Sequence, residues 1–126
     1  MSNLCEVMAI VRTNKMTDTK KALEEIGYPS FTAFRCFGRG KQGGRLKELA
    51  YPVSPEIKEK IEQAPASFIP KRIIMAVVPE DTVPKIVEII IRVNQTGEHG
   101  DGKIFVFPVE DTKRVRTGDS GLEALL

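Results

Sequence analysis

Two short apolar stretches, VMAIV at residues 7–11 and IMAVV at residues 74–78, decide the architecture of this chain. Each lies inside a longer run, 4–11 and 69–78, whose apolar and β-branched residues are typical of a strand. The two stretches resemble each other although they are far apart in the sequence. We therefore expect them to begin two similar halves of one fold.

A helical pattern follows each of these strands. The first helix is predicted to be capped by Thr17 or Asp18, to end at Gly27, and to bury Ala22, Leu23 and Ile26. The second is predicted to begin at Pro79, Glu80 and Asp81, with a buried stripe of Val83, Ile86, Val87, Ile90 and Val93 or Asn94.

Each helix leads into another strand, residues 30–37 in the first half and residues 103–109 in the second. The order βαβ, long connection, βαβ predicts an α+β fold of the ferredoxin-like type. This βαββαβ fold is an antiparallel sheet with two helices on one face. Because the open face of the sheet also carries apolar residues, we expect a partner subunit to bury it.

Composition limits the class of protein. A chain of 126 residues fits one domain, residues 1–126, and 41% hydrophobic with 29% charged residues is ordinary for a globular protein. A net charge of +2 does not favour nucleic-acid binding. We find no signal peptide and no membrane-spanning run, and Cys5 and Cys36 are expected to be free thiols. The predicted location is cytoplasmic, without membrane insertion.

The connection between the two halves is long and polar. Residues 38–44, GRGKQGG, begin it, and residues 55–64 could form one short helix of marginal stability. A connection of this length in a small domain is usually functional or disordered. We expect a flexible loop over about residues 39–68 that orders against another molecule, and a second loop over about 111–126.

A glycine-rich segment precedes the last strand. Gly97, Gly100 and Gly102 allow a tight loop with accessible N–H groups, and Lys103 follows at once. Peptide N–H groups and an ammonium group can all be directed at one anion. Arg114 and Arg116 alternate, so an extended segment would present both on the same face. Together these features suggest a polyphosphate ligand.

Two generic motifs match glycine spacings in this chain, one in residues 97–103 and one in residues 38–43. The spacing of Gly97, Gly102 and Lys103 matches the start of a Walker A loop, but Ile104 stands where Ser or Thr is needed, and the loop precedes a strand rather than a helix. Residues 38–43 mimic a dinucleotide fingerprint without the helix that should follow. Neither generic motif therefore accounts for the glycines that it matches.

The run GDGKIFVFPVEDTKRVRTGDSG, from Gly100 to Gly121, resembles the C-terminal signature of the PII signal-transduction proteins. Gly38, Gly40, Gln42 and Gly44 resemble that family's motif at the base of its T-loop, and residues 68–71, FIPK, resemble the segment that re-enters the sheet after that loop. The resemblance covers nearly the whole chain. It implies the ferredoxin-like fold, a homotrimer, and a nucleotide site in each cleft between subunits.

The resemblance also implies ligands and roles. ATP or ADP is expected to contact the phosphate loop and to be held by arginines of the neighbouring subunit, through the residues Thr32, Gly38, Gly40, Gly100, Asp101, Gly102, Lys103, Arg114 and Arg116. Within that set Thr32 is expected near the adenine. The family's 2-oxoglutarate is expected at Gln42, Lys71, Gly40, Lys41 and Gly44. Gln42 would help to hold Mg²⁺, which ATP phosphates and 2-oxoglutarate complete.

This sequence departs from the common family pattern in two ways. Gly43 replaces a lysine, and the loop over residues 44–68 is longer and lacks the surroundings of the uridylylated tyrosine, because Tyr51 lies in LAYPVS. These departures resemble the branch encoded with nitrogenase in archaea and anaerobic bacteria. That branch implies pairing with a related PII subunit and control of dinitrogenase, which 2-oxoglutarate releases.

Three classes of function follow. The first is a regulator that senses ATP, ADP and 2-oxoglutarate and controls dinitrogenase or, alternatively, an ammonium transporter or a nitrogen-assimilation enzyme. The second, an enzyme, has no nucleophile–base set in its support. The third is an RNA-binding module, suggested by Phe105 and Phe107 on one strand face. Core packing explains these aromatics better, since the chain lacks the basic surface that RNA requires.

Overall fold

The computed structural model describes residues 3–28, 30–39, 55–56 and 68–125. The elements in chain order are β1 (Leu4–Arg12), a 3-10 turn (Thr13–Lys15), α1 (Met16–Glu25), β2 (Thr32–Gly38), β3 (Ile69–Pro79), a 3-10 turn (Glu80–Thr82), α3 (Val83–Asn94), β4 (Gly102–Val109) and a C-terminal 3-10 segment (Gly121–Leu125). Of the short helix predicted over residues 55–64, only Pro55 and Glu56 are described, and both are helical.

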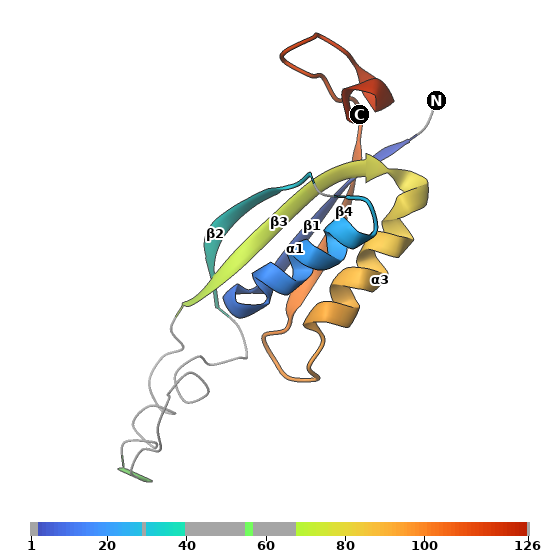
Figure 1. Cartoon of the computed structure of the whole chain (residues 1–126). Coiled ribbons are helices and arrows are strands. Elements are labelled where there is room, and N and C mark those ends of the chain that lie inside the picture. Colours follow the sequence, from blue (N-terminus) through green and yellow to red (C-terminus); the bar gives the residue numbers. More distant parts are fainter. Residues whose placement is uncertain (1–2, 29, 40–54, 57–67, 126) are drawn as a thin grey trace.

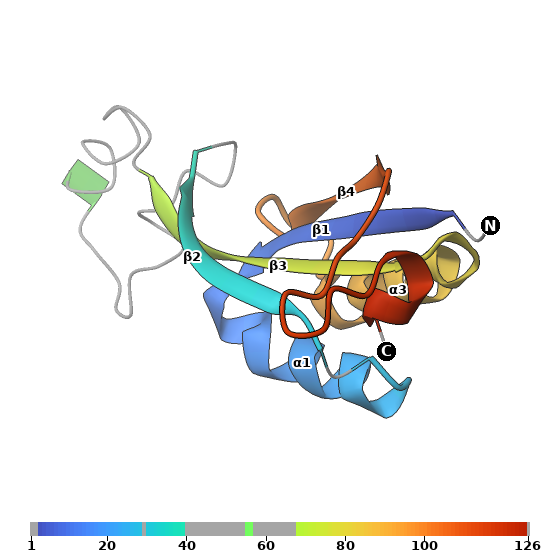
Figure 2. The ribbon, with the colours of Figure 1, turned by 90° about the horizontal axis from the view of Figure 1, so that it is seen from above.

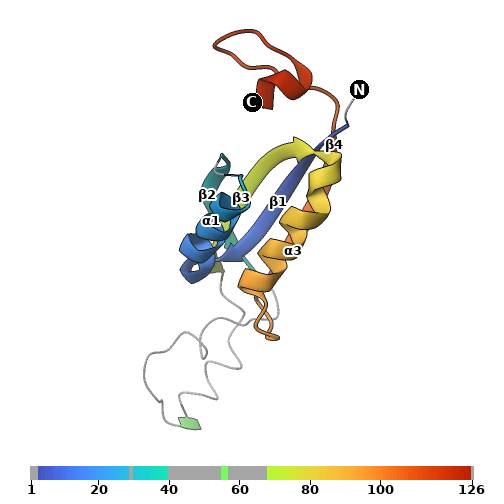
Figure 3. The same ribbon diagram turned by 45° about the vertical axis from the view of Figure 1, so that its right-hand side comes forward.

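The strands form one four-stranded sheet in the order β2-β3-β1-β4, and every neighbouring pair is antiparallel. Both helices cover the same face of this sheet (Figures 1 and 3). The ferredoxin-like α+β fold predicted from the repeated βαβ pattern is therefore confirmed. Among the described residues, no helix is long and apolar enough to cross a membrane.

The core lies between the sheet and the two helices. Val7, Ala9 and Val11 are buried while their neighbours along β1 are not, because alternate side chains of a strand leave on opposite faces. They pack in one cluster with Ile74 and Val78 of β3 and with Leu23, Ile86 and Ile90 of the helices. The predicted buried stripe of α3 is confirmed at Ile86, Ile90 and Asn94.

The start of α1 differs from the prediction. The helix begins at Met16, directly after the 3-10 turn, and no side chain caps it. Thr17 and Asp18 are both exposed within the first turn, so the capping prediction is wrong. The turn already directs the chain into the helix, and the buried threonine is Thr19, which is fully enclosed.

The open face of the sheet carries apolar side chains. Phe105 and Phe107 lie opposite Met8 and Glu6 in the register and are each 42% exposed, with ring centroids 6.4 Å apart. Core packing is therefore the wrong interpretation of these two residues within a single chain. Burial of this exposed apolar face by a partner subunit stays a prediction.

The two ends of the sheet carry different segments. At the Arg12 end of β1 lie the loop between α3 and β4 and the point where β2 ends and β3 begins. At the Leu4 end lie the start of β2 and the C-terminal segment (Figures 1 and 2). Residues at one end of the sheet therefore cannot form a site together with residues at the other end of the same chain.

Candidate functional site

The loop between α3 and β4 is built on glycines with positive φ. Gly97 has φ +88°, Gly100 has φ +97° and Gly102 has φ +123°. A Cβ atom on Gly102 would lie 2.0 Å from the backbone oxygen of Ile10, so this glycine is required both by conformation and by space. The predicted glycine loop is therefore a tight loop pressed against β1.

The carboxylate of Asp101 holds this loop closed. Its oxygens accept hydrogen bonds from the backbone N–H of Thr96 at 2.7 Å and of Gly97 at 3.0 Å, and from the hydroxyl of Thr96. Arg12 lies 3.3 Å from the same carboxylate. These hydrogen bonds, first the hydroxyl and backbone of Thr96 and then Gly97 and Arg12, hold the pKa of Asp101 well below its ordinary value.

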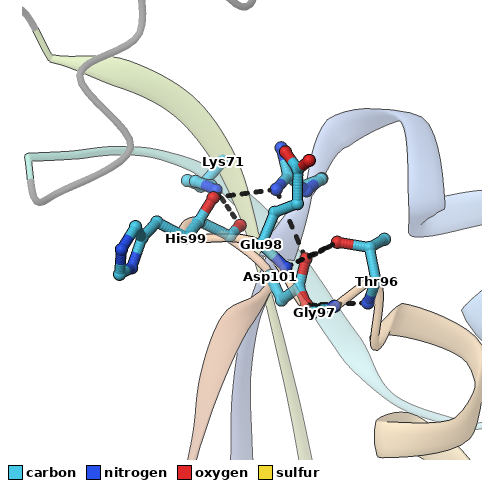
Figure 4. Close-up of polar contacts among 8 residues, drawn as sticks. Lys71, Thr96, Gly97, Glu98, His99 and Asp101 are labelled. Carbon is cyan, nitrogen blue, oxygen red and sulfur yellow. Dashed lines mark hydrogen bonds and ion pairs between the residues drawn. The ribbon is translucent and has the colours of Figure 1, made fainter.

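Two cations from the sheet hold the outer part of the loop. Nη2 of Arg12 donates to the backbone oxygen of His99 at 3.0 Å, and Nζ of Lys71 donates to that of Gly100 at 2.5 Å. Lys71 is only 7% exposed. Figure 4 shows the Lys71 side chain directed at the loop, with the ring of His99 directed away. The loop is thus fixed by residues from β1, β3 and the end of α3.

A cleft of about 380 Å³ opens beside the loop. Its walls are mostly apolar and come from β1, α3 and the first residues of β4, including Ile10, Ile90, Ile104 and Lys103. Gly38 lies near this end of the sheet as well, because it ends β2, and a Cβ atom there would lie 3.6 Å from Cγ of Lys71. Five predicted site residues therefore gather at this end with Lys71, namely Gly38, Gly100, Asp101, Gly102 and Lys103.

The segment with Arg114 and Arg116 is a closed turn, not an extended strand. The N–H of Gly118 donates to the backbone oxygen of Arg114 at 2.7 Å, and the N–H of Arg114 donates to that of Asp119 at 2.8 Å. The extended segment that this prediction assumed is therefore not present, because residues 115–117 form a turn whose Val115 is fully exposed.

Polar contacts give this arginine loop, residues 111–120, a defined shape. The guanidinium of Arg114 contacts the carboxylate of Asp119 at 3.1 Å and donates to the backbone oxygen of Glu123 at 2.9 Å. Asp111 accepts from the N–H of Thr112 at 2.8 Å, which is the largest cause of its lowered pKa. The loop thus presents its two arginines from a folded segment rather than from a free tail.

Thr32 lies near the C-terminal segment rather than near the glycine loop. It lines a hollow of about 620 Å³ together with Met75 and Val77 of β3 and with Leu122 and Leu125 of the C-terminal segment. Thr32 is the first residue of β2 and Gly38 is the last, so the strand separates them. The sequence analysis expected Thr32 near the adenine, and the structure places it beside the C-terminal 3-10 segment and away from the glycine loop.

The other predicted site residues, Gly40, Lys41, Gln42 and Gly44, and Tyr51 lie outside the described residues. Within the described ranges, no group of three or more His, Cys, Asp or Glu side chains could hold a metal ion. Arg12 and Thr96 were missed by the sequence analysis. A basic residue that ends a strand and a threonine after a helix carry no signal of their own.

Comparisons with known proteins show which family the chain resembles. A family model described as "Nitrogen regulatory protein P-II" matches residues 4–119. A protein of Methanothermobacter marburgensis named "nitrogen fixation nifHD region GlnB-like protein 2" is 50% identical over 121 residues, which are 95% of this chain and 98% of that protein. A protein of Methanosarcina barkeri named "nitrogen fixation nifHD1 region GlnB-like protein 2" is 44% identical over 95% of this chain and 98% of its own.

Among solved structures, the crystal structure of Arabidopsis thaliana PII bound to citrate matches with a TM-score of 0.74 and 33% sequence identity. The match covers 98% of this chain and 92% of the plant protein. The similarity therefore extends over the whole fold, including both ends of the sheet.

Proposed function

The chain belongs to the P-II family of nitrogen regulatory proteins, and from that premise we propose that it is a trimeric sensor of ATP or ADP and 2-oxoglutarate that controls a target protein. The trimer is a homotrimer or a mixed oligomer with a related subunit. In this proposal residues 1–126 form one domain, located in the cytoplasm, which regulates its target and performs no catalysis of its own.

The observation that carries the proposal is the separation of the two charged loops. The glycine loop with Lys71 and Lys103 lies at one end of the sheet, and the arginine loop lies at the other. A single chain therefore cannot direct both at one phosphate group. A neighbouring copy can, if its arginine loop lies against this chain's glycine loop, and the exposed apolar sheet face supplies a surface for such association.

The residues at the glycine loop fit a nucleotide. Backbone N–H groups of a glycine loop and the ammonium of Lys103 would hold phosphates, and Arg114 and Arg116 of a neighbour would supply further charge-assisted hydrogen bonds. Thr32 belongs to the neighbour's contribution, on the adenine side. Mg²⁺ would join the phosphate oxygens to 2-oxoglutarate and neutralise their charge. Lys71 would bind a carboxylate of 2-oxoglutarate.

The proposed target is dinitrogenase. Relatives at 43–50% identity carry names that place them in nitrogen-fixation regions of methanogenic archaea. A relative at 37% identity in Haloferax mediterranei is named "nitrogen regulatory protein GlnK2". The segment of residues 40–67, which connects β2 to β3, would contact the target, since it leaves the sheet beside Gly38 and Lys71.

A mixing experiment tests the shared site. One variant, Lys103→Ala, lacks a cation of the glycine loop, and the other, Arg114→Ala with Arg116→Ala, lacks the arginines. Each homo-oligomer should bind ATP at least about tenfold more weakly, because each charge-assisted hydrogen bond contributes about 1.5–3 kcal/mol. Mixed trimers, purified after co-expression with two affinity tags, should regain about one site of wild-type affinity per trimer.

Calorimetry with ATP measures both the affinity and the number of sites. The control is a sample in which both tags carry the same variant, which should show no recovery. Mixed oligomers without any wild-type-affinity site would contradict the shared site. Wild-type protein that binds neither ATP nor ADP would overturn the proposed function itself.

A further inference from the structure

Asp101 stands in the loop that the proposed function assigns to phosphate binding, and its negative charge needs an explanation. A carboxylate directed at the phosphates would repel them. Both of its oxygens are instead occupied inside the loop, by the N–H groups of Thr96 and Gly97, by the Thr96 hydroxyl and by Arg12. The hydrogen-bonding capacity of this carboxylate is therefore directed at the loop itself and at Arg12.

These contacts close the loop on itself. The carboxylate joins residue 101 to residues 96 and 97, directly across the turn (Figure 4). Hydrogen bonds to a charged group are stronger than those between neutral groups. A loop held in this way loses less conformational entropy when a ligand binds, because its shape is fixed in advance.

Arg12 connects the closed loop to the sheet. Besides contacting Asp101, it donates to the backbone oxygen of His99, while Lys71 donates to that of Gly100. Peptide oxygens repel an anion, and here two of them are directed at cations of the chain itself. The ion pair with Arg12 also offsets the charge of Asp101, so the loop remains suited to an anion.

From these contacts we propose that Asp101 is a positioning residue. It braces the glycine loop through Thr96, Gly97 and Arg12, and it does not touch the nucleotide. This inference rests on the proposed function, because it says how the chain's own residues prepare the phosphate site. The sequence analysis named Asp101 as a direct contact of ATP, and the brace replaces that role with an indirect one.

The variant Asp101→Asn distinguishes a brace from a mere repulsive charge, because the two roles predict opposite changes in ATP affinity. If the residue were only a negative charge near the phosphates, its neutralisation would strengthen ATP binding. If it is a brace, the amide can accept through one oxygen only, so one side of the loop loses its acceptor. ATP affinity should then fall about tenfold, the loss expected for a charge-assisted hydrogen bond.

A second pair of variants tests the brace without changing any charge. Thr96→Val removes the hydroxyl that donates to Asp101 and keeps the shape of the side chain, and it should weaken ATP binding several-fold, by roughly the worth of one such bond. Thr96→Ser keeps the hydroxyl and should bind ATP nearly as the wild type does. Glu88→Gln on α3 is the control for net charge, since its exposed pairing with Arg92 lies outside the loop.

Calorimetry should compare ATP with adenosine for every variant. A brace on the phosphate loop weakens ATP binding and leaves adenosine affinity unchanged, whereas a general loss of fold weakens both. Equal or tighter ATP binding by Asp101→Asn would overturn the inference. Equal ATP binding by Thr96→Val and the wild type would overturn it as well.

Amide hydrogen exchange of the ligand-free protein gives a readout that needs no nucleotide. The N–H groups of Thr96 and Gly97 should exchange faster in Asp101→Asn than in the wild type, while core amides such as that of Ala9 keep their rates. Unchanged exchange at Gly97 would contradict the brace. If the wild type bound no adenine nucleotide, the proposed function would fail, and this exchange would still decide whether Asp101 holds the loop.

Discussion

Gly102 is the residue at which the loop and the sheet leave the least room. Its φ of +123° is unfavourable for any side chain, and a Cβ atom would meet the backbone oxygen of Ile10 at 2.0 Å. Gly97 has a comparable φ of +88°, but a Cβ atom there would meet nothing within 4 Å. A side chain at Gly97 would therefore cause conformational strain alone, whereas one at Gly102 would cause strain and a steric clash.

We expect Gly102→Ala to destabilise the fold more than Gly97→Ala. The positive φ alone costs about 1–3 kcal/mol in each variant, and the collision at Gly102 adds to it because backbone atoms cannot move as a side chain can. Urea unfolding gives both free energies. Equal losses of unfolding free energy in the two variants would show that the loop can move away from β1 without cost.

The acid dependence of Asp101 is a second prediction at this scale. Hydrogen bonds from Thr96 lower the pKa of this carboxyl in the folded chain, so the unfolded chain binds the proton more readily. The resulting stability is fully present above the ordinary pKa of about 4 and is lost as pH falls below it. The difference in unfolding free energy between the wild type and Asp101→Asn should therefore shrink from pH 6 to pH 2.

Urea unfolding at four or five pH values measures this difference. Asp81→Asn serves as the comparison, because Asp81 is exposed in the 3-10 turn that precedes α3. A gap between the wild type and Asp101→Asn that stays constant over the whole range would contradict the assignment of Asp101 as an ionised brace.

A buried polar contact joins α1 to α3. Nδ2 of Asn94 donates to the hydroxyl of Thr19 at 3.0 Å and to the backbone oxygen of Ile90 at 2.9 Å. The Thr19 hydroxyl donates in turn to the backbone oxygen of Lys15 at 2.8 Å. Both side chains are buried, so each lost partner leaves a polar group without water.

Thr19→Val should therefore destabilise the fold by about 1–3 kcal/mol, since the amide of Asn94 loses a buried acceptor. Asn94→Leu together with Thr19→Val should recover much of that loss, because both partners become apolar. A double-mutant cycle measured by urea unfolding checks this. Additive losses would show that the contact between the helices contributes nothing of its own.

Local patterns predicted the elements well and their connections less well. Runs of apolar and β-branched residues identified all four strands, and the 3.6-residue stripe identified Ile86 and Ile90, because that stripe follows from burial of one helix face. The cap of α1 and the buried Thr19 were missed. A polar residue on a helix is normally exposed, and only the packing of α1 against α3 makes Thr19 an interior residue.

In the candidate site, too, local sequence patterns predicted local features and missed contacts between distant residues. Glycine spacing and Lys103 predicted the loop, since those residues act locally. Arg12 could not be found in that way, because 89 positions separate it from Asp101. The turn around Arg114 was also missed, since it closes through a hydrogen bond from Gly118 that a strand-like alternation of charges does not reveal.

At the scale of the whole molecule, the sheet separates the glycine loop from the arginine loop, which the proposed function brings together between subunits. Lys71 lies at the glycine-loop end, where β3 begins, and the segment of residues 40–67 enters the sheet beside it. Its Nζ already donates to the backbone oxygen of Gly100. A carboxylate bound at Lys71 would therefore act on the phosphate loop and on the base of the connecting segment at once.

This arrangement predicts reciprocal coupling between 2-oxoglutarate and the target. If Lys71 binds a carboxylate of 2-oxoglutarate, the ligand selects those conformations of the connecting segment that are compatible with the site. The direction expected for a nitrogenase-linked regulator is that 2-oxoglutarate with ATP releases dinitrogenase. A coupling free energy of about 1–3 kcal/mol, or roughly 5- to 150-fold in affinity, would suffice.

The measurement is the affinity for purified dinitrogenase over a titration of 2-oxoglutarate at saturating ATP. Lys71→Ala should bind the target and fail to release it, whereas Lys85→Ala on the exposed side of α3 should respond as the wild type does. Because Lys71 also holds Gly100, the ATP affinity of Lys71→Ala must be measured first, and ATP raised until its sites are filled. Release of the target from Lys71→Ala at wild-type concentrations of 2-oxoglutarate would then exclude Lys71 as the residue that couples the metabolite to the target.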